Sequence, residues 1–272
     1  MHKKLWTLLK YLVLALGAVV VITPFWIMLL NSVKSANEII SNPLSLPAKP
    51  DFSGYVGVFV QLNIGRLFLN SIFVSASTMA LNVLLSLTVA YGILKCNLPG
   101  KSAWRSLILS SMMLPSILML IPQYQMFFQW GWINSFKVMI LPVCISAYNI
   151  FLMMQFMHSI SDEYLEAARM DGASEPFILY GIVLPLSLPA ISTVGILSFM
   201  DSWNDFMRPL LYMTDQNKMT LQLAVFRFKT LIPNGHFQQL WAATTLVTVP
   251  IVIAFLCVQR NFIKAFTGVG LK

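Results

Sequence analysis

The stretch EYLEAARMDGASEPFILYGIVLP, Glu163 to Pro185, stands between two strongly apolar segments and guides the interpretation of the whole chain. Four of the ten acidic residues fall in its first thirteen positions. Ser161 is a favourable N-cap, and acidic residues in a first turn suit the helix dipole. Gly172 suits the left-handed turn that follows a helix end. We expect a short polar helix up to Gly172 and a second helical element that begins at Ser174-Glu175-Pro176.

The composition of the chain indicates an integral membrane protein. Of 272 residues, 57% are hydrophobic and only 10% are charged, with a mean hydropathy of +0.74. Soluble domains carry about 25% charged residues. The net charge of +8 comes from residues next to apolar segments, not from a basic stripe. This pattern predicts contact with membrane lipid and excludes a nucleic-acid partner.

Six apolar segments predict an all-α membrane protein with six transmembrane helices. Each is long enough, or nearly so, to cross about 30 Å of hydrocarbon as a helix. None shows the alternating pattern of an outer-membrane barrel. The first continues too far for a signal peptide, so we expect an uncleaved helix. The expected spans are Tyr11–Asn31, Leu67–Leu94, Ser106–Phe127, Val138–Met157, Leu184–Met200 and Leu240–Gln259.

The basic residues that flank these spans predict the orientation of the chain. Short basic segments favour the cytoplasm, so both termini are expected there. The polar segment 161–185 then lies in the cytoplasm between spans four and five. Ser32–Arg66, which includes a proline-rich loop, and Phe206–Gln239 lie outside. We expect residues 1–66 to hold the first helix and external loop, and 67–272 to form a core with a cytoplasmic C-terminal tail.

The polar segment resembles the EAA signature of ABC importer permeases. The spacing of its residues agrees with that signature throughout, and FMDSWNDFMRPLLYM (Phe199–Met213) and the segment after Leu240 are similar to the MalG-like branch for carbohydrates. The resemblance covers nearly the whole chain. It implies a type I importer permease in the inner membrane of a bacterium or archaeon. The matching residues are Glu166, Ala167, Ala168, Gly172, Ile182, Leu184 and Pro185.

The resemblance also implies a role for each of these residues. In that family the polar helix is a coupling helix that docks on an ATP-hydrolysing subunit. Glu166 would make polar contacts there, Ala167 and Ala168 would let the helix seat, and Gly172 would make the turn. The remaining residues would join the coupling helix to span five: Ile182, Leu184 and Pro185. The solute-contacting residues are not identified.

The partners implied are a second permease subunit, two ATPase subunits and an extracytoplasmic solute-binding protein. ATP and Mg would bind the ATPases, and this chain would be a translocation subunit for a sugar or oligosaccharide rather than an enzyme. Gly100-Lys101-Ser102 does not form a P-loop, because Lys95 stands where the first glycine is required. Two alternatives stay open: a secondary carrier that acts alone, and a non-transporting membrane scaffold.

No catalytic, cofactor-binding or metal site is expected in this chain. The three histidines and three cysteines form no catalytic, disulfide or metal-binding pattern. Asp201, Asp205 and Arg208 are spaced for a structural ion pair, with a proton relay as the alternative. Uncharged polar residues within the spans could link helices or line a solute path. They are Asn70, Asn82, Asn149, Gln155 and Ser198.

Overall fold

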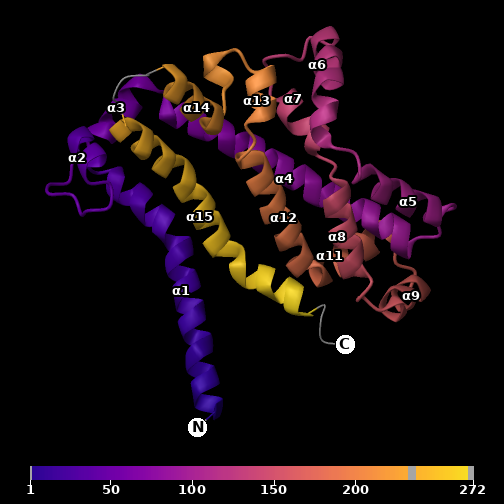
Figure 1. Cartoon of the computed structure of the whole chain (residues 1–272). Coiled ribbons are helices and arrows are strands. Elements are labelled where there is room, and N and C mark those ends of the chain that lie inside the picture. The colour runs from indigo at the N-terminus through magenta and orange to yellow at the C-terminus, as the bar shows by residue number, and fades with distance from the viewer. Residues whose placement is uncertain (1, 232–236, 269–272) are drawn as a thin grey trace. The chain divides into compact units, whose positions relative to one another are not determined.

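The computed structural model describes residues 2–231 and 237–268, and every regular element within those ranges is a helix (Figure 1). The predicted all-α class is therefore confirmed. His236 and the tail beyond Gly268 lie outside the described residues, as do positions 232–236 of the predicted external loop.

Three helices are long and apolar enough to cross a membrane unaided. They are α1 (His2–Asn31), α4 (Ile64–Lys95) and α15 (Phe237–Gly268). Their apolar parts span 28, 32 and 21 residues, against the roughly 20 that a bilayer requires. These apolar parts contain the first and second predicted spans in full and all but the last two residues of the sixth.

The other three predicted spans coincide with pairs of shorter helices that meet at a bend. Lys101–Ser111 meets Ser116–Gln129 at 89°, Lys137–Val143 meets Ala147–Met157 at 41°, and Glu175–Leu186 meets Leu188–Trp203 at 82°. Each pair could form one broken span, so the count of six remains a prediction. The elements in these pairs are α5 (Lys101–Ser111), a 3-10 turn (Ser116–Met119), α6 (Leu120–Gln129), α7 (Lys137–Ile140), a 3-10 turn (Leu141–Val143), α8 (Ala147–Met157), α10 (Glu175–Phe177), a π-helical turn (Ile178–Val183), α11 (Leu184–Leu186) and α12 (Leu188–Trp203).

Local backbone preferences account for the bends. Pro115 is extended between α5 and the following 3-10 turn. A proline disfavours helical geometry in the residue before it, which here is Leu114. Ser146 is extended and caps α8 by accepting a hydrogen bond from the Asn149 amide. Ser187 leaves helical geometry just before Leu188-Pro189, so that α12 begins anew with proline in its first turn.

The remaining described helices are short and lie in the connections. They are α2 (Ala36–Ser41), α3 (Ser53–Gln61), α9 (Asp162–Met170), α13 (Met207–Tyr212), a 3-10 turn (Gln216–Lys218) and α14 (Leu221–Leu231).

The chain divides into two compact units. The first joins residues 1–64 with 224–250, and the second joins 65–223 with the residues from 251 onward. The sequence-based division after Arg66 stays a prediction, and it differs from these units by assigning 224–250 to the core. In the first unit, the buried Lys34 ammonium donates to the carbonyls of Asn42 and Pro43, at 2.9 and 3.0 Å. These bonds hold the start of the proline-rich segment between α2 and α3 in place.

The second unit is built on α4, α8 and α12, whose apolar side chains share one buried cluster. The polar helix α9 lies at one end of this unit, and α6, α7 and α13 lie at the other (Figure 1). The broken spans thus separate a polar helical end from an end that carries several short helices.

A buried amide network ties these three helices together. The Asn149 side-chain amide on α8 donates to Asn82 Oδ1 on α4 and to Ser198 Oγ on α12, both at 2.9 Å. Asn82 in turn donates to the Val143 carbonyl at 3.0 Å. Within an apolar medium such groups require partners. These three span residues therefore link helices, which was one of the two roles considered for them.

We expect Asn149→Ala to lower the free energy of unfolding by about 1–2 kcal/mol, because Asn82 and Ser198 lose a buried partner. Thermal unfolding in detergent would measure this. Gln155→Ala is the matched control, since Gln155 is exposed on the same helix and should change stability by less than about 0.5 kcal/mol. Equal destabilisation by both variants would contradict a linking role.

Candidate functional site

The polar helix α9 has the caps that its sequence predicts. Ser161 Oγ accepts a hydrogen bond from the Glu163 amide at 3.3 Å, which satisfies one free donor of the first turn. At the other end Gly172 has φ +78°, and the Ala173 amide donates to the Ala168 carbonyl at 3.0 Å. This closes the helix with a left-handed glycine. The predicted bounds of the helix are confirmed.

The two sides of α9 differ in what they contact. Leu165 is fully buried, and Ala168 packs beside it against the apolar cluster of the second unit. Tyr164 and Met170 are exposed, as are Ala167 and Glu166. The two alanines therefore lie in different settings: Ala168 seats α9 on its own chain, and Ala167 is open on the outer surface. The exposed tyrosine and methionine give a polar helix an apolar outer face.

The start of α9 is tied to the end of α4 by Lys95. Its side chain is buried, and its ammonium donates to the Ile160 carbonyl at 2.8 Å and to Asp162 Oδ1 at 2.7 Å. A buried ammonium needs such partners. The hydrogen bond from Lys95 holds the pKa of Asp162 below its ordinary value, so the carboxylate stays ionised at neutral pH.

The end of α9 is tied to the same helix by Arg169 and Glu175. Arg169 Nε donates to Glu175 Oε1 at 2.8 Å, and Arg169 Nη2 donates to the Lys95 carbonyl at 2.9 Å. The Tyr91 hydroxyl on α4 donates to the other oxygen of Glu175. Together with the Lys95 contacts, these bonds form what we call the α4–α9 clamp: Tyr91, Lys95, Asp162, Arg169 and Glu175.

The later residues of the signature lie along the path from α9 to α12. Ile182 and Leu184 pack against the same apolar cluster as Leu165, and Pro185 is exposed. The path turns by 82° immediately after, at the buried Ser187. A displacement of α9 would thus reach α12 through a packed connection.

Sequence reasoning did not identify the clamp. Lys95 enters the sequence argument only as the residue that replaces a P-loop glycine, and Tyr91 lies in an ordinary apolar segment. The bonds between clamp residues that reach α4 join residues 67 to 84 positions apart, so no local pattern reveals them. One usable signal was Lys95, a basic residue at the end of the second span, on the side of the membrane where the acidic segment was also expected.

The ion pair expected near the end of span five is present at the other end of the unit. Arg208 Nε lies 2.7 Å from Asp205 Oδ2, at the i,i+3 spacing. The predicted structural pair is confirmed.

Residues 82–268 match the family described as the inner membrane component of binding-protein-dependent transport systems. The chain belongs to this family. It is thus a multi-pass inner-membrane translocation component that works with a solute-binding protein, and it is not an enzyme. The resemblance to ABC importer permeases is confirmed.

The similarity to three bacterial permease proteins extends over most of the chain. The diacetylchitobiose uptake system permease protein NgcG of Streptomyces coelicolor is 29% identical, over 93% of this chain and 85% of its own. The probable ABC transporter permease protein YurM of Bacillus subtilis is 30% identical, over 92% and 83%. The lactose transport system permease protein LacG of Rhizobium radiobacter is 25% identical, over 98% and 97%.

A solved structure has the same fold. It is that of a bacterial ABC transporter involved in the import of the acidic polysaccharide alginate, with a TM-score of 0.84 and 22% identity. The match covers 96% of this chain and 98% of the other. The predicted ABC importer permease fold is confirmed.

We expect Gly172→Ala to destabilise the turn after α9 by about 1–2 kcal/mol, because an alanine at φ +78° is strained. No neighbouring atom would meet the new Cβ, so only the backbone conformation is tested. Hydrogen exchange of the amides that follow Met170 should accelerate. Gly172→Asn is the matched control and should have a smaller effect, since asparagine tolerates this conformation. If the amides exchanged at the same rate in Gly172→Ala as in Gly172→Asn, the capping role would be contradicted.

Proposed function

We propose that the chain is the permease subunit of an ABC importer for a sugar or oligosaccharide, and that α9 is the coupling helix that receives the motion of an ATPase subunit. The observation that carries the mechanism is the α4–α9 clamp, which fixes a helix with an exposed outer face to a transmembrane helix. The relatives named for diacetylchitobiose and lactose transport support the solute class.

The outer face of α9 suits a protein partner. Tyr164 and Met170 expose apolar surface beside the small Ala167, while Glu166 adds a charge. Aromatic residues and methionine are enriched at interfaces, and a small residue such as alanine lets two helices approach closely. In this assignment Glu166 and Ala167 contact the ATPase, Gly172 sets the turn, and Ala168 holds the helix on its own unit.

The clamp would make α4 part of the moving body. Both ends of α9 are bonded to the last two turns of α4, and the path through Ile182, Leu184 and Pro185 leads to α12. A partner that pulls on α9 would therefore displace two membrane helices together. Bound ATP would favour one access state by stabilising the closed ATPases, and hydrolysis would reset it.

The complete importer would contain a second, different permease subunit, two ATPase subunits that bind ATP and Mg, and an extracytoplasmic binding protein. Both termini and α9 would face the cytoplasm, and Phe206–Gln239 would face the binding protein. The membrane lipid would cover the exposed apolar surface of helices such as α1.

The mass and composition of the complex that co-purifies in mild detergent would test this assignment first. We expect one copy of a second permease, two copies of an ATPase, and ATP hydrolysis stimulated by a loaded binding protein. A chain that remains free of ATPase after gentle extraction would refute it.

Ala167→Arg and Glu166→Lys should each weaken co-purification of the ATPase at least tenfold, which corresponds to about 1.4 kcal/mol. Bulk and reversed charge would be introduced at the proposed contact, while the buried face of α9 is unchanged. Ala103→Arg is the matched control, because Ala103 is an exposed alanine in the first turn of α5. Full ATPase binding by both α9 variants would remove the docking assignment.

Glu175→Gln should lower solute uptake per ATP hydrolysed several-fold while the ATPase remains bound. The neutral side chain weakens the bonds to Arg169 and Tyr91, so α9 would move without α4. Uptake and hydrolysis in proteoliposomes would measure the ratio. Glu163→Gln is the control, since Glu163 is exposed on α9 and outside the clamp. An unchanged ratio in Glu175→Gln would show that the clamp is not part of coupling.

A further inference from the structure

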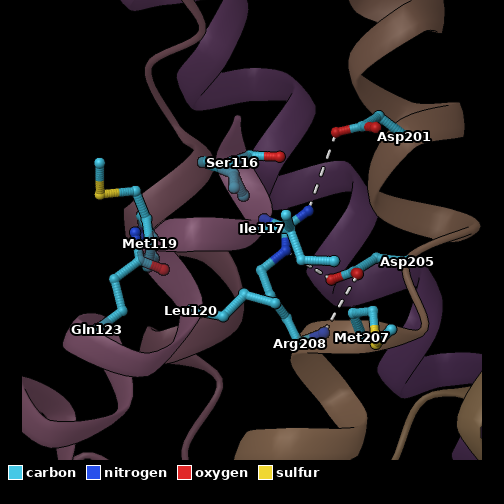
Figure 2. A pocket seen from close by; sticks show the side chains of 11 residues that line it. Ser116, Ile117, Met119, Leu120, Gln123, Asp201, Asp205, Met207 and Arg208 are labelled. Carbon is cyan, nitrogen blue, oxygen red and sulfur yellow. Dashed lines mark hydrogen bonds and ion pairs between the residues drawn. The ribbon is translucent and has the colours of Figure 1, made fainter. Parts of the chain in front are cut away.

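A cavity of about 390 Å³ lies at the end of the second unit that carries α6 and α13, away from α9. One wall comes from the end of α12 and the start of α13, with Asp201, Asp205 and Arg208. The facing wall comes from the 3-10 turn Ser116–Met119 and from α6, as Figure 2 shows. Its volume is in the lower part of the range of ligand sites, about 300–1,000 Å³.

The charged groups of this cavity are arranged unevenly. Arg208 and Asp205 are largely buried and joined at 2.7 Å. Asp201 is 80% exposed, and its carboxylate lies 3.9 Å from Arg208 Nη2. In Figure 2 the guanidinium extends between the two carboxylates. The Arg208–Asp205 pair is held in place by its burial and its ion pair. The Asp201 carboxylate is open to solvent beside this pair.

The contact between Asp201 and Arg208 leaves room for a ligand atom. A separation of 3.9 Å is too long for a direct hydrogen bond. A hydroxyl group placed beside both could donate to the carboxylate and accept from the guanidinium. Among the described residues, Arg208 Nη1 also has no hydrogen-bond partner. That nitrogen is buried, so the donor that faces Asp201 at the edge of the cavity is Nη2.

The facing wall suits the body of a sugar ring. Ile117 and Leu120 present apolar surface, and Ser116 and Gln123 add polar groups that both donate and accept hydrogen bonds. An exposed carboxylate at the level of a membrane helix is not expected to face lipid. The cavity is instead suited to a water-filled path.

We propose that this cavity is a subsite for a neutral saccharide on the solute path, with Asp201 and Arg208 as the hydroxyl-binding pair. The inference rests on the proposed importer function and adds to it a position and a solute class. Two carboxylates face one guanidinium, so the three groups carry a net charge of −1. Uronates and sulfonated sugars would be repelled, and neutral sugars would bind without that penalty.

Chemical modification of Met207→Cys would test the site, because Met207 lines the cavity and can be reached by solvent. The variant would be made in a chain whose three cysteines are replaced by serine, within the complete importer in detergent. A water-soluble methanethiosulfonate would label it with and without millimolar lactose, raffinose, diacetylchitobiose, arabinotriose or trigalacturonate. Leu46→Cys is the control, since Leu46 is exposed in the segment between α2 and α3.

At least one neutral sugar should slow labelling of Met207→Cys several-fold, and trigalacturonate should not. Neither the neutral sugars nor trigalacturonate should slow labelling of Leu46→Cys. Adding Asp201→Asn should reduce the protection by neutral sugars at least threefold. Asp201 is exposed, so this change is expected to leave folding intact. Absence of protection by every sugar, equal protection by trigalacturonate, or protection unaffected by Asp201→Asn would each overturn the proposal.

ATP-driven uptake separates this inference from the proposed function. If the importer with wild-type Asp201 takes up a neutral sugar but shows no protection, the subsite is wrong and the importer assignment stands. If it takes up no sugar and hydrolyses ATP without response to solute, the proposed function itself fails. An Asp201→Asn importer should show a KM for the neutral sugar raised at least threefold.

Discussion

Hydrocarbon cannot satisfy backbone or side-chain polar groups, and this constraint shapes the membrane helices of the chain. It accounts for the helical fold and for the internal pairing of polar side chains. Asn149 bonds to Asn82 and Ser198 within the apolar core of the second unit. Where the chain bends near Pro115 and Ser187, short helices take over on either side, so that few backbone groups lose their partners.

In the described part of the second unit, ion pairs lie at both ends, and they are organised differently at each. At the α9 end, Lys95 and Arg169 are bonded to carbonyls and carboxylates in a closed arrangement that connects two helices. At the other end, the Asp205–Arg208 pair is closed but Asp201 is left open beside a cavity. A fully satisfied network holds its members in one arrangement, whereas an open carboxylate keeps free hydrogen-bonding capacity.

The α4–α9 clamp also explains how so short a helix as α9 can be held in a fixed position. A helix of nine residues is not stable alone in water. Here Leu165 is buried, Ser161 and Gly172 close its ends, and Lys95 and Arg169 hold it against α4. Its orientation is set by the helices that it is bonded to, so its exposed face has a defined position.

Much of this protein could be predicted from the sequence because the deciding signals are local. Apolar run length predicted the helical membrane class, and cap chemistry predicted the bounds of α9 around Ser161 and Gly172. The i,i+3 spacing also predicted the Asp205–Arg208 pair. The tertiary structure alone decided the bends within three predicted spans, the contrasting settings of the two alanines, and the bonds from Lys95 to α9. These depend on which distant surfaces pack together, and neither periodicity nor spacing within one segment contains that information.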